Sequence, residues 1–97
     1  MLNKDSIHSF KEAFGRFLQS ESLEEKFQEK ELIHSWGEIM GEPIAKRTSK
    51  IFIKDHTLFV ALTSAPLRQE LQMAKNKVLA LLEKHLGRRV INDVKFL

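Results

Sequence analysis

The chain has 97 residues, of which 42% are hydrophobic and 30% charged, a composition typical of a small soluble globular protein. It contains no Cys, which excludes disulfides and thiolate metal sites, and it shows neither a signal-peptide pattern nor an apolar run of membrane-spanning length. We therefore expect one cytoplasmic domain over residues 1–97.

The net charge of +3 is unevenly distributed along the chain. Residues 1–45 hold five Lys/Arg and nine Asp/Glu, a net charge of −4, whereas residues 46–97 hold eleven and four, a net charge of +7. This asymmetry predicts a surface for an acidic partner, with nucleic acid the first candidate. The alternative is that the positive charges are scattered, solvated side chains.

The first part of the chain predicts two helices, at about 6–19 and 22–40, because apolar residues recur at spacings of three and four. Trp36 shares the apolar side of the second helix, so we expect it in the core rather than as a stacking platform for bases. Gly37 would allow close packing of that helix. Gly41 reads as its end, and Pro43 begins a short helical turn.

A β-hairpin is predicted next, at about 50–63, with Asp55-His56 as a two-residue turn. This turn pairs Ile53 with Leu58, Phe52 with Phe59 and Ile51 with Val60. The aliphatic residues then share one face, which we assign to the core. Phe52 and Phe59 stand together on the opposite face, flanked by Lys50 and Lys54.

A long helix is predicted over about 65–86, with Ser64 as its N-cap and Gly87 as its stop. Its expected buried side is formed by Leu67, Leu71, Ala74, Val78, Leu81, Leu82 and His85. The run at about 90–97 predicts a third strand. The element order α-α-β-β-α-β, with a strand–helix–strand end, favours an α+β fold with a mixed three-stranded sheet and a long helix packed on it.

Two sets of residues are candidates for binding nucleic acid. Aromatic rings interleaved with cations suit single strands, which points to Phe52 and Phe59; alternatively the Phe-rich N-terminal helix covers these rings, or they form a docking or self-association face. Arg68 and Lys75 lie seven residues apart, hence near one face of the long helix. The basic residues predicted to contact phosphate are Lys46, Arg47, Lys50, Lys54, Arg68, Lys75, Arg88 and Arg89.

The sequence gives little support for a catalytic site or a metal site. The four His residues are dispersed, and the pair of His34 and Glu38 at helical spacing lacks a third ligand. Asp55-His56 is assigned to the hairpin turn rather than to a catalytic dyad. The sequence contains no phosphate loop, nucleophile motif or Gly-x-x-Gly clamp. We predict no catalytic residue, no metal and no cofactor.

Several short pieces of the chain form an ordered set. They are Trp36-Gly-Glu-Ile-Met-Gly41, Ile44-Ala45, Thr48, Leu58-Phe-Val60, Thr63-Ser64-Ala65, Leu67-Arg-Gln-Glu70-Leu71, Leu86-Gly87 and Ile91-Asn-Asp-Val94-Lys-Phe96. Taken in this order, they resemble the DciA-like family, long known only as a domain of unknown function, and the resemblance covers about residues 6–97.

The resemblance implies a fold similar to type II KH domains and a non-enzymatic role in bacterial DNA replication. It implies DNA, single- or double-stranded and with little sequence preference, and the DnaB-type replicative helicase as partners. Longer members of that family continue in a flexible C-terminal tail, and no contact that depends on the tail is transferred to this sequence. Two alternatives stay open: an RNA-binding or ribosome-associated factor, and a protein–protein adaptor that binds no nucleic acid.

Overall fold

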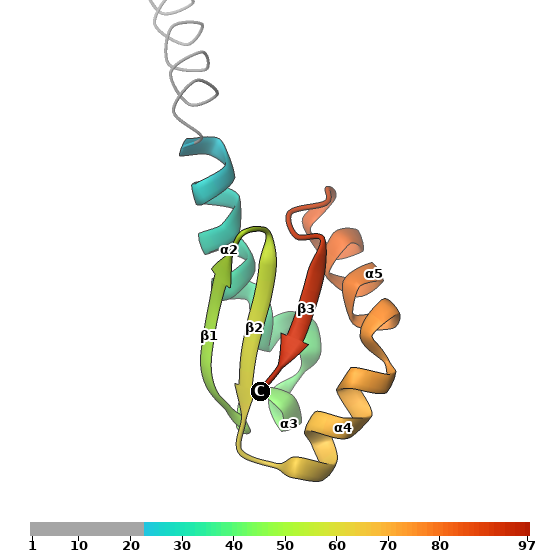
Figure 1. Cartoon of the computed structure of the whole chain (residues 1–97). Helices are drawn as coiled ribbons and strands as arrows, with labels where there is room; N and C mark the ends of the chain where they lie inside the picture. The colour runs from blue at the N-terminus through green and yellow to red at the C-terminus, as the bar shows by residue number, and fades with distance from the viewer. Residues whose placement is uncertain (1–22) are drawn as a thin grey trace, which may run out of the picture.

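The computed structural model describes residues 23–97, so the helix expected at 6–19 lies outside the described residues. Four helices and three strands follow one another in this part (Figure 1). In chain order they are α2 (Leu23–Met40), α3 (Glu42–Ala45), β1 (Thr48–Lys54), β2 (Thr57–Leu62), α4 (Ala65–Met73), α5 (Lys75–Leu86) and β3 (Asp93–Phe96).

The three strands form one mixed sheet in the order β1-β2-β3, which confirms the expected α+β class. β1 and β2 are antiparallel, and β2 and β3 are parallel. Asp55 and His56 both have positive φ, 51° and 59°, as a type I′ turn requires. This turn fixes the predicted register, with Phe52 opposite Phe59.

The core lies between the sheet and the helices, which cover one face of the sheet (Figure 1). Alternation along the strands places apolar side chains on this face. The buried core residues are Leu32, Trp36, Leu58, Val60, Leu62, Leu71, Val78, Leu82, Ile91, Val94 and Phe96. Ile51 and Ile53 of the edge strand are half-buried and pack against this core.

The end of α2 is fixed by a partly buried hydrogen-bonded group. Trp36 is 3% exposed, and its Nε1 donates to Thr48 Oγ1 at 3.1 Å. That hydroxyl in turn donates to the carbonyl oxygen of Ile44 at 2.9 Å. A Cβ on Gly37 would lie 3.3 Å from Cβ of Ala45, so α2 and α3 approach closely at this glycine. Gly41, at φ 93° and ψ 163°, separates the two helices in a backbone region that is almost specific to glycine.

The long helix predicted over 65–86 is divided, which corrects the sequence-based expectation. α4 ends at Met73 and α5 begins at Lys75, with Ala74 between them at φ −99° and ψ 18°. The chain therefore turns where the sequence has neither Gly nor Pro. Ser64 caps α4, accepting from the N–H of Leu67, and Gly87 ends α5 at φ 75°.

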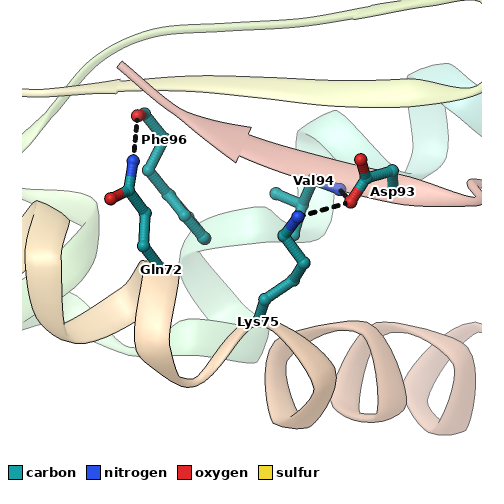
Figure 2. A network of polar contacts seen from close by, with 5 residues as sticks. All are labelled: Gln72, Lys75, Asp93, Val94 and Phe96. Carbon is teal, nitrogen blue, oxygen red and sulfur yellow. Dashed lines mark hydrogen bonds and ion pairs between the residues drawn. The ribbon is translucent and has the colours of Figure 1, made fainter.

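Contacts with β3 hold the bend between the two helices (Figure 2). Gln72 Nε2 donates to the carbonyl oxygen of Phe96 at 3.0 Å, and Lys75 Nζ lies 3.0 Å from Asp93 Oδ1. These partners are distant in sequence, so the bend is a tertiary feature rather than one of local propensity.

The buried side of α5 also differs from the prediction. Leu81 is 47% exposed and His85 is exposed, whereas Leu79 and Leu86 pack against the core. The exposure of Leu81 and His85 and the packing of Leu79 and Leu86 both reflect the bend, because α5 approaches the sheet on its own axis rather than as the continuation of α4.

The last strand is shorter than the predicted run of 90–97. β3 begins at Asp93, although Ile91 before it is already buried. Within residues 23–97, no helix combines the length and apolar character that crossing a membrane requires.

Candidate nucleic-acid interface

One face of the sheet carries no helix in the part of the chain that the structure describes (Figure 1). Side chains that alternate with the buried ones point to this side. We call it the open sheet face, and by strand alternation and register it is formed by Lys50, Phe52, Lys54, Thr57, Phe59, Ala61 and Lys95.

Two aromatic rings stand at its centre. The rings of Phe52 and Phe59 are stacked, with centroids 4.9 Å apart and planes inclined by 12°. Lys50 Nζ lies 5.2 Å from the centroid of Phe52, and Lys95 Nζ lies 5.9 Å from that of Phe59. Both distances are within cation–π range. The arrangement is a half-buried aromatic pair with a cation on each ring.

Each strand contributes to this group through its register. The hairpin turn places Phe52 opposite Phe59, and the parallel pairing of β2 with β3 places Lys95 beside Phe59. Sequence reasoning missed Lys95. Its position between inward-facing Val94 and Phe96 could have shown that it points outward, but its neighbour depends on the strand order, which no local pattern reveals.

Three other predicted phosphate contacts lie at the ends of β1. Lys54 is exposed beside the turn and belongs to the open sheet face. Lys46 and Arg47 are exposed at the entrance to β1, and Lys46 Nζ lies 3.5 Å from Glu42 Oε1. Such an exposed pair is weak, so Lys46 can exchange this carboxylate for another anion at little cost.

Arg68 and Lys75 were predicted to share one face of a single helix, and this expectation is wrong. They lie on different helices, and each is bound within the fold. Arg68 Nη2 donates to the carbonyl oxygen of Leu62 at 3.1 Å. Lys75 pairs with Asp93, and its hydrogen bond, helped by the backbone N–H of Val94, lowers the pKa of that carboxyl (Figure 2).

Arg88 and Arg89 follow Gly87 in the loop between α5 and β3. Arg88 Nη1 lies 3.4 Å from Glu24 Oε1 at the beginning of α2. Both arginines are exposed. The structure therefore divides the predicted basic residues, and it places Lys50 and Lys54, with Lys95, on the open sheet face.

The described residues contain no set of side chains that could bind a metal ion. Among residues 23–97, no three His, Cys, Asp or Glu side chains are grouped closely enough to hold one ion. The polar groups near the rings are ammonium groups, which bind anions.

A comparison with curated proteins found no match. The family model described as "Dna[CI] antecedent, DciA" matches residues 9–96, nearly the whole chain. Members of this family are associated with loading of the DnaB-type helicase in replication. With a match of this extent, the chain belongs to the DciA family.

Proposed function

We propose that this chain binds single-stranded DNA on the open sheet face while it assists the DnaB-type replicative helicase. The observation that supports the proposal is the stacked pair of Phe52 and Phe59 with Lys50 and Lys95 over its rings. Membership of the DciA family supplies the replication context and implies the helicase as partner.

The two residue types match the two parts of a single strand. Bases stack on aromatic rings, and each stacked base contributes about 1–3 kcal/mol. A base can join the stack beside Phe52 in place of the Lys50 ammonium, or beside Phe59 in place of the Lys95 ammonium. Losing an exposed cation–π contact costs about 0.5–1 kcal/mol, so the exchange is favourable. The displaced ammonium is then free to meet a phosphate.

Duplex DNA fits this face less well, because its bases are stacked on one another and expose only their edges. Flat faces and ammonium groups also discriminate poorly between bases. We therefore expect strong dependence on salt and little dependence on sequence.

The test is a titration of the whole protein with a fluorescein-labelled oligothymidylate of about 12 nucleotides, within the usual range of single-strand sites. Fluorescence anisotropy is measured across a salt series. The double variant Lys50→Ala, Lys95→Ala should weaken binding and flatten the slope of log K against log[salt] by about 1.4, at about 0.7 for each lost phosphate contact.

The matched control is Lys77→Ala, Lys84→Ala, which removes the same charge from exposed positions of α5. If both double variants change the slope equally, the effect is one of net charge, and the open sheet face is rejected as the site. Competition with an oligouridylate of the same length tests the RNA alternative, since tighter binding of RNA would redirect the proposal.

A further inference from the structure

The two edges of the sheet differ in how their backbone groups are satisfied. At β3, the N–H of Leu97 donates to the carbonyl oxygen of Val60, and the carbonyl oxygen of Leu97 accepts from the N–H of Leu62. Backbone direction alternates along a strand, so Val94 and Phe96 turn their N–H and C=O groups away from β2.

Two of these outward-facing backbone groups of β3 form hydrogen bonds with side chains. Asp93 Oδ1 accepts from the N–H of Val94 at 2.8 Å, and Gln72 Nε2 donates to the carbonyl oxygen of Phe96 at 3.0 Å (Figure 2). Covering an edge in this way reduces its ability to pair with another strand. The β3 edge is therefore partly closed by the chain itself.

The β1 edge has no such partners among residues 23–97. Val60 directs its backbone toward β3, so Ile51 opposite it directs its own N–H and C=O groups away from the sheet. Ile53, two residues on, does the same. No side chain of the described part donates to or accepts from these groups, and β1 is an outer strand (Figure 1).

The side chains of β1 indicate what could lie beside it. Lys50 and Lys54 flank Phe52 on the open sheet face, while Ile51 and Ile53 are half-buried on the helix side. β1, with the sequence TSKIFIK, contains no Asp or Glu. A neighbouring strand would thus meet cations on one face and aliphatic side chains on the other.

We propose that the β1 edge binds an extended acidic segment of a partner protein as a fourth strand of the sheet. Its main chain bonds to the N–H and C=O groups of Ile51 and Ile53, which supplies affinity for any extended peptide. Acidic side chains on one face pair with Lys50 and Lys54, and apolar ones on the other extend the contact with the two isoleucines. The lysines disfavour basic segments, which gives the edge its selectivity.

The test uses three blocked heptapeptides: Gly-Glu-Val-Glu-Val-Glu-Gly, the same peptide with Lys for Glu, and the Glu peptide with both Val residues N-methylated. Amide hydrogen exchange of the whole protein is followed by NMR. With the Glu peptide at ten times its Kd, exchange at Ile51 and Ile53 should slow about tenfold, while that at other residues stays unchanged. The Lys peptide and the N-methylated peptide should produce no slowing.

The double variant Lys50→Glu, Lys54→Glu should reverse the preference, binding the Lys peptide instead. Lys77→Glu, Lys84→Glu changes the net charge equally on α5 and should retain the original preference. The proposal is overturned if no peptide slows exchange at Ile51 and Ile53, or if the N-methylated peptide slows it equally. It is also overturned if these amides are already protected in a dimer of the free chain, because a second copy then occupies the edge.

Discussion

The ring of Phe52 lies stacked on that of Phe59 across the hairpin, with centroids 4.9 Å apart. Neither ring belongs to the buried core, and no helix of residues 23–97 covers the face on which they stand. An aromatic pair in this position can serve stability, binding or both, and the two roles make different predictions for a conservative substitution.

Replacing both rings by aliphatic side chains should separate these roles. The double variant Phe52→Leu, Phe59→Leu keeps apolar contact but removes the flat faces, so we expect affinity for single-stranded DNA to fall about tenfold or more. The loss of the stacked pair should lower the free energy of unfolding by only about 0.5–1.5 kcal/mol. Anisotropy titration and urea denaturation measure the two quantities.

Phe27→Leu is the control, because Phe27 is 70% exposed on α2 and outside the sheet. It should change neither affinity nor stability appreciably. A folded double variant at Phe52 and Phe59 that binds DNA within twofold of the unmodified chain would leave the aromatic pair with a structural role alone.

Thr48 should be important for stability although it is small and polar. Its hydroxyl accepts from Trp36 Nε1 and donates to the carbonyl oxygen of Ile44. Thr48→Val preserves the shape but leaves both groups without this partner, so the free energy of unfolding should fall by about 1–3 kcal/mol. Thr48→Ser keeps the hydroxyl and serves as control. Equal stability of the Val and Ser variants in urea would contradict the assigned hydrogen bonds.

Local signals explain why part of the fold could be predicted from the sequence. The hairpin register followed from a two-residue turn between apolar runs, which leaves one pairing that places Ile51, Ile53, Leu58, Val60 and Leu62 on one face. The Trp36 helix end followed similarly from Gly41 and Pro43. These are short-range constraints, so the sequence around them contains the information needed.

The features that could not be predicted depend on distant contacts. The bend at Ala74 has no Gly or Pro and is held by Gln72 and Lys75 through β3. Lys95 reaches the aromatic pair only because β3 is added parallel to β2, at the edge opposite β1. The order of the strands depends on contacts across the whole fold, and the set of residues on the open sheet face follows from that order.

The two glycines with positive φ should respond differently to substitution. Gly41→Ala places a Cβ at φ 93° and ψ 163°, where the strain is about 1–3 kcal/mol. Gly87, at φ 75° and ψ 5°, is in the left-handed helical region, and nothing lies within 4 Å of an added Cβ. Gly87→Asn should therefore be tolerated, because Asn adopts this conformation. Thermal unfolding checks the order; a Gly41→Ala variant as stable as Gly87→Asn would refute it.

His56, in the hairpin turn, is coupled to the beginning of α2. Its Nε2 lies 2.6 Å from Glu25 Oε1. This hydrogen bond, together with the negative charge of Glu25, raises the pKa of His56 above 6.5, and the charges of Glu29 and Asp55 act in the same direction. Both side chains of the pair are about half exposed, so the pair is screened and its contribution is small.

The sign of the pH dependence follows from the raised pKa. A group whose pKa is higher in the folded state stabilises that state fully below its unfolded pKa, and the contribution disappears as the pH rises through the folded pKa. Glu25→Gln should therefore lower the pKa of His56 and reduce stability more at about pH 6 than at about pH 8.5. Glu31→Gln, also exposed on α2, makes the same charge change as a control. NMR titration of the His56 ring measures the pKa directly, and an unaltered value in Glu25→Gln would show that the two side chains do not pair in solution.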